Sequence, residues 1–136
     1  MKALVDTSVW SQIFRRQIAP RDDTVAGELK RLIVDYRVVM IGPIRQELLS
    51  GIRAREQYEG LRDRLRAFPD LRLLPDDYEL AAQFFNQCRS KGVQGSNTDF
   101  LICAVASRRD LSVFSIDRDF ESYARILHIA SHQVGG

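Results

Sequence analysis

Four acidic residues are the side chains in this chain that could do chemistry together. Each follows or adjoins an apolar run, and they are Asp6, Glu47, Asp99 and Asp117. Carboxylates a few ångström apart repel by several kcal/mol at an effective dielectric constant of about 20, so gathering them requires cations. Mg²⁺ and Mn²⁺ take oxygen ligands, keep several waters and bind substrate phosphates. The pattern therefore predicts a divalent-metal site, provided that the fold brings these acids to one place.

The elements that must position these acids alternate between strands and helices. Short, mostly apolar runs predict strands at residues 2–5, 38–41, 71–74, 111–116 and 126–129. The run at 38–41 has the composition of a strand buried on both faces. Apolar spacing and helix-start signals predict helices at residues 8–16, 24–33, from 43 through 47, 54–68, 75–88, 96–106 and shortly after 117. This alternation predicts an α/β fold with a doubly wound parallel sheet. Asp6 and Asp117 follow strands, so we expect both at the carboxyl edge of the sheet, where such folds bind ligands.

Each acid also has a purely structural interpretation. Asp99 lies three residues after Ser96, so it could belong to an acidic variant of a capping box and complement the helix dipole. Asp117 could cap the helix that follows it, and Glu47 could be a solvated residue beside the apolar face of its helix. Asp6 is the hardest to explain in this way, because a carboxylate that ends a buried strand needs a partner.

The composition predicts one globular domain covering residues 1–136. Hydrophobic residues make up 45% of the chain, which is enough to bury a core. The net charge is only +2, but 17 of the 20 basic residues are arginine. Because the planar guanidinium group binds phosphate through two donors, this bias weakly favours an anionic partner.

The cysteines and histidines form no metal or disulfide pattern. Cys88 and Cys103 lie far apart in apolar helical segments, so we expect buried free thiols, as in a reducing cytosol. His128 and His132 have no further soft ligands near them, which disfavours zinc. The chain shows no signal-peptide core and no run near the roughly 18 apolar residues of a membrane helix. We therefore expect a soluble, cytoplasmic protein.

Four stretches together resemble the PIN-domain nucleases, and within them the VapC-type toxins of prokaryotic toxin–antitoxin pairs. In chain order they are Leu4-Val5-Asp6-Thr7-Ser8-Val9, Pro43-Ile44-Arg45-Gln46-Glu47-Leu48, Thr98-Asp99-Phe100-Leu101-Ile102 and Ser115-Ile116-Asp117-Arg118-Asp119-Phe120. No stretch is specific alone, but all of them in this order cover essentially the whole chain. The resemblance implies a three-layer α/β/α sandwich with a central parallel β-sheet, and metal-dependent endoribonuclease activity.

The resemblance also implies roles for particular residues. The catalytic acids would be Asp6, Glu47, Asp99 and Asp117, of which Asp6, Asp99 and Asp117 would hold Mg²⁺ or Mn²⁺. Asp119 could share or replace the role of Asp117, and Glu47 would bind the metal directly or through a water. Thr7 or Ser8 matches the hydroxyl group that accompanies the first acid. The metal would activate a water for attack on the scissile phosphorus, leaving a 5′-phosphate and a 3′-hydroxyl.

Arginines are the candidates for holding the RNA backbone. They are Arg15, Arg16, Arg45 and the series from Arg53 to Arg66. On a helix Arg55, Arg62 and Arg66 form one stripe, which could equally be a solvated face. Beyond the RNA substrate, the resemblance implies a small antitoxin whose tail occupies the acidic groove, and a homodimer.

Two other functions share part of the pattern. A phosphatase of the haloacid dehalogenase type also has an Asp after its first strand, but it needs a second Asp at the position of Ser8. A non-catalytic, divalent-metal-dependent protein-binding module begins Asp-x-Ser-x-Ser, which Asp6 and Ser8 match and Trp10 breaks. Turnover of phosphomonoesters would support the first alternative, and cation-dependent protein binding without hydrolysis would support the second.

Overall fold

A parallel sheet of short strands lies at the centre of the molecule. The computed structural model describes residues 1–14 and 23–134. Within these residues the strands are β1 (Ala3–Val5), β2 (Val38–Val39), β3 (Ser112–Phe114) and β4 (Ala130–Ser131). Their order across the sheet is β2-β1-β3-β4, and every neighbouring pair is parallel. The predicted α/β class with a central parallel sheet is confirmed.

β1 lies inside the sheet and delivers the chain to its carboxyl edge. All of its residues are buried, and Leu4 stands opposite Val39 of β2 and Val113 of β3. The backbone N–H of Asp6 donates to the carbonyl of Phe114 at 2.9 Å, so the ladder continues one residue beyond the strand. The Asp6 side chain therefore starts at the carboxyl edge of the sheet, as predicted.

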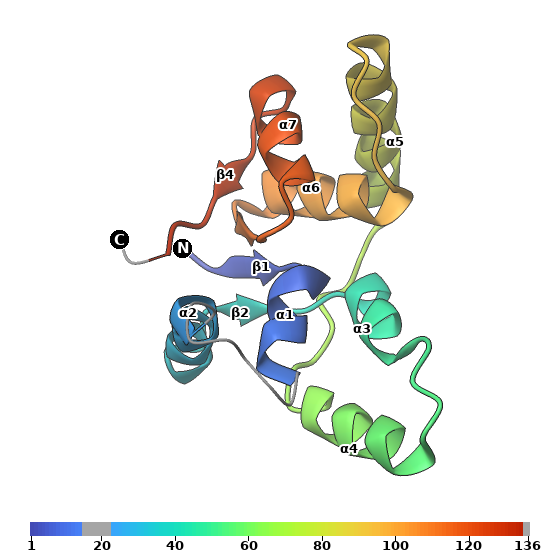
Figure 1. The fold of residues 1–136 in the computed structure, drawn as a ribbon. Helices are drawn as coiled ribbons and strands as arrows, with labels where there is room; N and C mark the ends of the chain where they lie inside the picture. Colours follow the sequence, from blue (N-terminus) through green and yellow to red (C-terminus); the bar gives the residue numbers. More distant parts are fainter. Residues whose placement is uncertain (15–22, 135–136) are drawn as a thin grey trace.

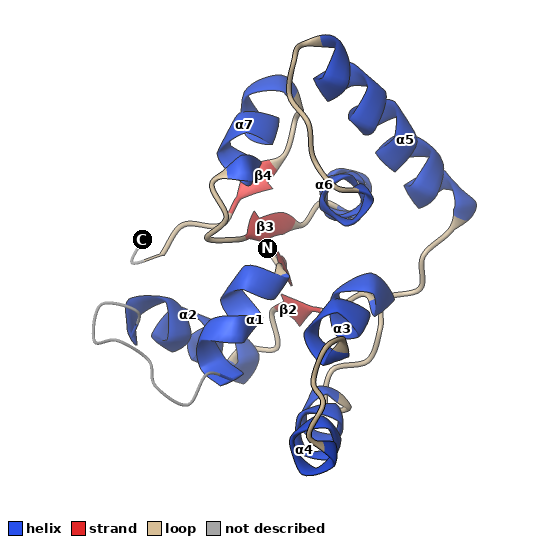
Figure 2. Cartoon of the chain, turned by 45° about the vertical axis from the view of Figure 1, so that its right-hand side comes forward, coloured by secondary structure: helices blue, strands red, loops and turns tan. Residues whose placement is uncertain are grey.

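Helices cover the sheet on both sides. They are α1 (Thr7–Phe14), α2 (Asp23–Val34), α3 (Gly42–Leu49), α4 (Arg55–Leu65), α5 (Pro75–Ser90), α6 (Asn97–Arg109) and α7 (Asp119–Ile126). Figure 1 shows α5, α6 and α7 together in its upper half and α1 to α4 in its lower half. Figure 2 shows the same two groups from another side. The arrangement is the expected α/β/α sandwich. No described helix combines the length and the apolar character needed to cross a membrane.

α6 is the most deeply buried helix. Every residue from Phe100 to Ala106 is buried, and these residues form an unbroken apolar run. The helix packs against α5 and β3. Its first turn carries Asp99 near Asp6, whose charge acts on the Asp99 carboxyl group. Ser96 caps the helix, because its Oγ accepts from the N–H of Asp99 at 3.1 Å. A rigid, buried helix thus carries Asp99 to the end of the sheet.

The predicted strand at residues 71–74 is wrong. Next to this segment the chain forms one isolated bridge, between Met40 and Asp70. It then turns away from the sheet, because the N–H of Leu74 donates to Asp77 Oδ2 at 2.8 Å in the cap that begins α5. The capping bond uses a donor that a strand would have needed for its ladder.

Other boundaries also differ from the prediction. α7 continues through Ile126, and the last strand is Ala130–Ser131 instead of residues 126–129. Phe120, Tyr123 and Leu127 are all buried at helical spacing, so the apolar residues continue the helix face. α4 ends at Leu65, before the predicted end at residue 68. β2 is an edge strand whose two residues are half-buried, whereas Met40 and Ile41, which complete the predicted run, are buried.

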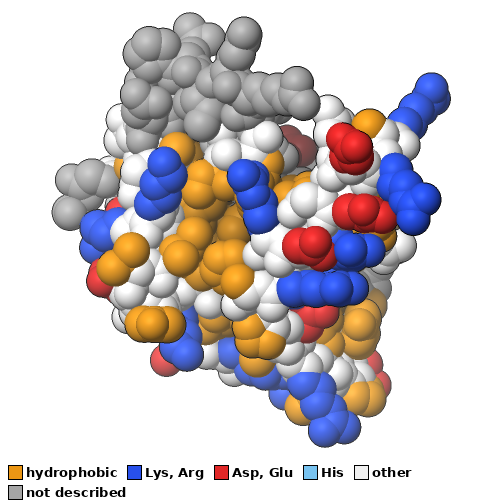
Figure 3. All heavy atoms as spheres, turned by 90° about the horizontal axis from the view of Figure 1, so that it is seen from below, with side chains coloured by type: hydrophobic (Ala, Val, Ile, Leu, Met, Phe, Trp, Pro, Cys, Tyr) orange, Lys and Arg blue, Asp and Glu red, His pale blue; other side chains and the backbone are white. Residues whose placement is uncertain are grey.

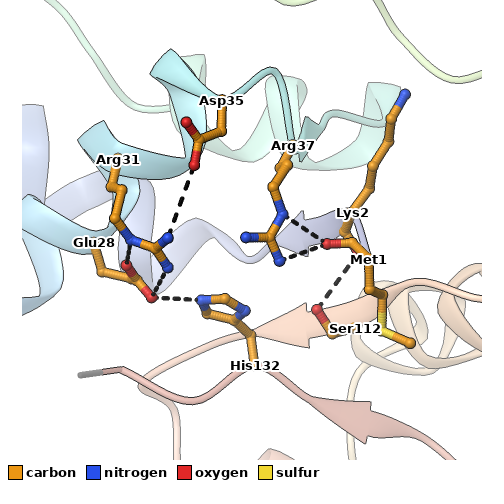
Figure 4. A network of polar contacts seen from close by, with 8 residues as sticks. All are labelled: Met1, Lys2, Glu28, Arg31, Asp35, Arg37, Ser112 and His132. Atoms are coloured by element: carbon orange, nitrogen blue, oxygen red, sulfur yellow. Dashed lines mark hydrogen bonds and ion pairs between the residues drawn. The ribbon is translucent and has the colours of Figure 1, made fainter. Parts of the chain in front are cut away.

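A polar network joins the C-terminal segment to α2 (Figure 4). The buried Glu28 accepts from Arg31 Nε at 2.6 Å, and its Oε2 lies 2.8 Å from Nε2 of His132. The Arg31 hydrogen bond lowers the pKa of Glu28 to about 2 against the opposing effect of burial, and His132 acts in the same direction as Arg31. His132 also follows β4, where its N–H donates to the carbonyl of Val113 at 2.8 Å. His132 is therefore a structural contact.

The two cysteines are free and buried, as predicted. Burial raises the pKa of the Cys103 thiol far above its usual range. Because the thiolate is the reactive form, this cysteine is an inert part of the core.

Candidate active site

Three carboxyl groups lie together at the carboxyl edge of the sheet. Each of Asp99, Asp117 and Asp119 offers one oxygen, and these oxygens all lie within 4.8 Å of one another. Asp99 comes from the first turn of α6, Asp117 from the loop after β3, and Asp119 from the start of α7. The predicted meeting of Asp99 with Asp117 is present, and Asp119 joins the same group. We call these three residues the aspartate cluster.

Asp117 lies in the aspartate cluster and also bonds the backbone at the start of α7. Its Oδ1 accepts from the N–H of Asp119 at 2.9 Å, which caps the start of α7. Its own N–H donates to Oγ of Ser115 at 3.0 Å. Since the cap fixes the loop after β3, it also holds Asp117 within the aspartate cluster. The structural interpretation and the metal-site interpretation are compatible here.

Asp6 is buried beside the cluster and is held by serine hydroxyl groups. Its side chain is only 6% exposed. Oδ2 accepts from Ser8 Oγ at 2.7 Å and from Ser115 Oγ at 2.8 Å. Among the described residues, Oδ1 has no hydrogen-bond donor, and no fully buried side-chain oxygen lacks a partner. Oδ1 is therefore the accessible oxygen of Asp6 and the one free to bind a ligand.

Glu47 lies outside the aspartate cluster and lines a separate hollow on the surface. Thr7 Oγ1 donates to Glu47 Oε1 at 2.7 Å. Thr7 and Ser8 therefore each donate a hydrogen bond to an acid, Thr7 to Glu47 and Ser8 to Asp6. The hollow has a volume of about 640 Å³ and is lined by Thr7, Pro43, Gln46, Glu47, Ser50 and Thr98. Glu47 is exposed, and none of the residues of the aspartate cluster lines this hollow.

The site carries negative charge that the protein leaves unbalanced. Burial raises the pKa of Asp99, and the nearby charges of Asp6 and Asp117 raise it further, against the hydrogen bonds of Tyr123 and Ser96. In residues 1–14 and 23–134, no ion pair joins a basic side chain to any of the site acids. Carboxylates that lie close together without a basic partner form a set of hard oxygen ligands. The donor set fits a divalent cation such as Mg²⁺ or Mn²⁺.

Tyr123 and Ser115 donate hydrogen bonds to the site acids, but the sequence analysis did not predict either of them as a site residue. The hydroxyl group of Tyr123 donates to Asp99 Oδ2 at 2.7 Å, and the ring is completely buried. Burial, followed by the bond to Asp99, raises the pKa of Tyr123 above its usual range, so the phenol stays neutral and keeps its proton to donate. The only available signals were a tyrosine on the apolar face of α7 and a serine at the end of β3.

The proposed RNA-contacting arginines differ in their surroundings. Arg15 and Arg16 lie outside the described residues. Arg45 closes the end of α4: its guanidinium group donates to the carbonyls of Leu65 and Phe68 and pairs with Asp70 at 2.9 Å. These bonds give Arg45 a structural role that the sequence did not indicate.

The arginine stripe of α4 lies among acidic side chains. Arg55 pairs with Glu59 at 3.0 Å, and Arg62 and Arg66 both pair with Asp63. Figure 3, seen from the side on which α4 lies, shows basic and acidic side chains interleaved beside an apolar area. This arrangement matches the solvated-face interpretation of the stripe.

Comparison with known proteins agrees with the geometry. The sequence matches a family model described as the PIN domain over residues 3–126. The fold resembles FitAcB from Neisseria gonorrhoeae with a TM-score of 0.77, 22% identity and 96% coverage of both chains. It resembles VapBC-5 from Mycobacterium tuberculosis, of the VapBC family of toxin–antitoxin systems, with a TM-score of 0.67, 20% identity and coverage of 98% of this chain and 100% of that one.

A further similar structure is Mycobacterium tuberculosis VapC20, described as a sarcin–ricin loop cleaving toxin. The TM-score is 0.67 and the identity 20%, over 95% of this chain and 99% of that one. Comparison with curated proteins gave no match. These structural likenesses show that the fold is shared over nearly the full length of each chain.

Proposed function

This chain belongs to the PIN domain family, and from that premise we propose that residues 1–136 form one nuclease domain. We propose that this domain is a metal-dependent endoribonuclease and acts as the toxin of a toxin–antitoxin pair. The observation that carries this proposal is the aspartate cluster, whose oxygens lie within 4.8 Å of one another without a basic partner among the described residues. Similar structures include a sarcin–ricin loop cleaving toxin and a toxin–antitoxin family member. No observation favours the phosphatase or the non-catalytic binding module.

The proposed metal ligands are Asp6, Asp99 and Asp117, with Asp119 as a further candidate. Asp99, Asp117 and Asp119 form the aspartate cluster, whereas Asp6 lies outside it and acts on Asp99 through its charge. All of the donors are carboxylate oxygens, which suits Mg²⁺ and also Mn²⁺ and disfavours ions that prefer nitrogen or sulfur. A bound divalent ion would lower the pKa of a water molecule and stabilise negative charge on the phosphate. Asp6 suits this role because the two serine hydroxyl groups hold Oδ2 and leave Oδ1 accessible.

The remaining side chains orient the reactants. Glu47, held by Thr7, faces the hollow beside Thr98, where it can accept a hydrogen bond from the attacking water or act as a direct ligand. In the proposed hydrolysis the water oxygen bonds to phosphorus, the bond from phosphorus to the 3′-oxygen breaks, and that oxygen takes up a proton. The products are a 5′-phosphate and a 3′-hydroxyl. Four acids at one site would repel RNA in the absence of cations, so the activity should depend on added metal.

The proposed partners are an RNA substrate, a small antitoxin and a second copy of the chain. The antitoxin proposal is supported by VapBC-5, which belongs to a toxin–antitoxin family. An antitoxin tail that occupies the groove beside Glu47 would block access to the aspartate cluster. The homodimer proposal rests on the family resemblance.

The experiment that tests the function is cleavage of a total RNA pool by the purified, antitoxin-free protein. Reactions contain Mg²⁺, Mn²⁺ or a chelator, and each compares the natural chain with Asp6→Asn and with Glu56→Gln. Glu56 is an exposed acid on α4, so its variant is the matched charge-removal control. We expect discrete fragments with 5′-phosphate ends only with metal, their loss in Asp6→Asn, and no change in Glu56→Gln. Cleavage that persists in chelator or in Asp6→Asn would contradict the proposal.

A further inference from the structure

We propose that Tyr123 is a positioning residue whose hydroxyl group holds the Asp99 carboxyl group in the orientation that binds the divalent cation. The inference rests on the proposed function, because it concerns the metal site of that nuclease. The phenolic O–H donates to Asp99 Oδ2 at 2.7 Å, and the two residues come from different helices, α7 and α6. Tyr123 would act only through Asp99 and would not touch RNA.

The tyrosine ring is held so that its hydroxyl group has a fixed place. Tyr123 is completely buried, and its ring centroid lies 4.9 Å from that of Phe100 and 5.2 Å from that of Phe120. Phe100 in turn contacts Phe85 of α5 at 5.5 Å between centroids. A ring packed between Phe100 of α6 and Phe120 of its own helix cannot change rotamer without disturbing the core. The hydroxyl group is therefore a rigid donor for Asp99.

The loop before α6 closes over the same hydroxyl group. A Cβ atom placed on Gly95 would lie 2.2 Å from Tyr123 Oη, 2.8 Å from Cζ and 3.0 Å from a ring carbon of Phe100. Any residue other than glycine would thus push the hydroxyl group aside. The close approach of the Gly95 backbone blocks an alternative position for the phenol. Packing of the loop and packing of the ring independently direct the hydroxyl group to Asp99.

Asp99 needs such a restraint because of its neighbours. The charges of Asp6 and Asp117 act on its half-buried carboxyl group, and Asp119 lies in the same cluster. In the absence of a cation, repulsion favours any rotation that moves the carboxyl group away from these charges. The hydrogen bond from Tyr123 opposes that rotation before the metal arrives. Hydrogen-bond partners of metal ligands generally raise metal affinity in this manner.

The test measures Mn²⁺ binding to the RNA-free protein by electron paramagnetic resonance. Tyr123→Phe keeps the ring and removes only the hydroxyl group, and Tyr36→Phe makes the same chemical change at a side chain that is 87% exposed. Removing a hydrogen-bond partner of a ligand typically weakens metal binding by about 10- to 100-fold. We expect the Mn²⁺ Kd to rise at least about tenfold in Tyr123→Phe and to stay unchanged in Tyr36→Phe.

Two further variants separate positioning from general packing. In an Asp99→Asn background, Tyr123→Phe should cause no additional loss of Mn²⁺ affinity, because the hydroxyl group acts through the Asp99 carboxylate. Gly95→Ala keeps the hydroxyl group but displaces it, so its Mn²⁺ affinity should fall as in Tyr123→Phe. Thermal melting with chelator verifies that each variant is folded before its affinity is compared.

The Mn²⁺-binding and RNA-cleavage results test the positioning role of Tyr123 and the nuclease function separately. Equal Mn²⁺ affinity in the natural chain and Tyr123→Phe would overturn the positioning role, as would an equal loss in the Asp99→Asn background. A natural chain that binds no Mn²⁺ would overturn the positioning role together with the metal site. If the natural chain binds Mn²⁺ more tightly than Tyr123→Phe but cuts no RNA, the positioning role stands and the nuclease proposal fails.

Discussion

The hydroxyl groups of Ser8 and Ser115 meet at a single oxygen of Asp6. Their Oγ atoms lie 3.3 Å apart, and both donate to Asp6 Oδ2, at 2.7 and 2.8 Å. Ser8 Oγ also accepts from the N–H of Ile116 at 3.2 Å, which ties the start of α1 to the end of β3. The orientation of Asp6 is thus set jointly by the first and the last parts of the fold.

Replacing Ser115 with alanine should weaken both the fold and the proposed site. The change removes a hydrogen bond to a charged, buried carboxyl group, and we expect the free energy of unfolding to fall by about 1–2 kcal/mol. Because Asp6 loses one of its two hydroxyl donors, RNA cleavage should fall about tenfold. Denaturant unfolding and cleavage rates measure the two effects. Ser90→Ala is the control, since Ser90 is exposed and bonds only the Gln87 carbonyl. Lost stability with unchanged cleavage would limit Ser115 to a structural role.

Replacing Asp99 with asparagine should stabilise the metal-free protein. The substitution keeps the shape and removes a charge that burial and the neighbouring acids disfavour. The unfolding midpoint in chelator should therefore rise relative to the natural chain. The same variant should lose the stabilisation by metal, which for the natural chain amounts to about 2.7 kcal/mol at a Mn²⁺ concentration of 100 times Kd. Thermal melts with and without Mn²⁺ test both statements. A lower midpoint in chelator would show that Asp99 has a stabilising contact apart from metal.

The contact of Glu28 with Arg31 and His132 should make stability depend on pH in the acid range. Arg31 chiefly, with His132, lowers the pKa of Glu28 from 4.5 to about 2 although burial opposes the shift. The folded state therefore holds the carboxylate more strongly than the unfolded state, so this stabilisation is present above pH 4.5 and is lost as the pH falls toward about 2. At roughly 1.4 kcal/mol per pKa unit, it is on the order of 3 kcal/mol.

Glu28→Gln provides the measurement for this pH dependence. We expect the difference in unfolding free energy between the natural chain and the variant to be largest near neutral pH and to shrink steadily below pH 4.5. Asp110→Asn is a control at an acid without an ion pair in the part of the chain described here. A difference that stays constant from neutral pH to about pH 2 would contradict the linkage.

Replacing Arg45 with alanine should destabilise the fold without altering phosphate contacts. Its guanidinium group bonds the carbonyls of Leu65 and Phe68 and pairs with Asp70. We expect a loss of about 1–3 kcal/mol in the free energy of unfolding. Arg55→Ala is the matched control, because Arg55 is 89% exposed and, within the described part of the chain, pairs with Glu59 alone. Its loss should stay within about 0.5 kcal/mol.

RNA binding at several salt concentrations completes the test of the arginines. The slope of log affinity against log salt reports how many phosphates are contacted. We expect this slope to be unchanged in Arg45→Ala and in a triple variant of Arg55, Arg62 and Arg66. A slope that falls by about one for each arginine removed would assign those side chains to the RNA backbone instead.

The sequence alone determined the class of fold and the place of the acids along it. Apolar runs separated by helical patterns predicted a parallel sheet, and carboxylates after such strands must lie at its carboxyl edge. That rule depends only on chain direction, so it correctly placed Asp6 and Asp117 at this edge. Asp117 meets Asp99 of the first turn of α6 there. The same local reasoning failed at residues 71–74, where the Asp77 cap competes with the sheet for a backbone donor.

Only the tertiary structure decided which side chains contact the acids. Tyr123 reaches Asp99 because its ring packs against Phe100 of α6. Arg45 bonds the end of α4 because α3 and α4 lie together. Such contacts depend on the distance and angle between helices that are far apart in the chain, and residue spacing does not encode these quantities directly. The sequence therefore identified the acids, whereas the packing of the helices determined the hydroxyl groups that hold them and the arginine that is committed to the fold.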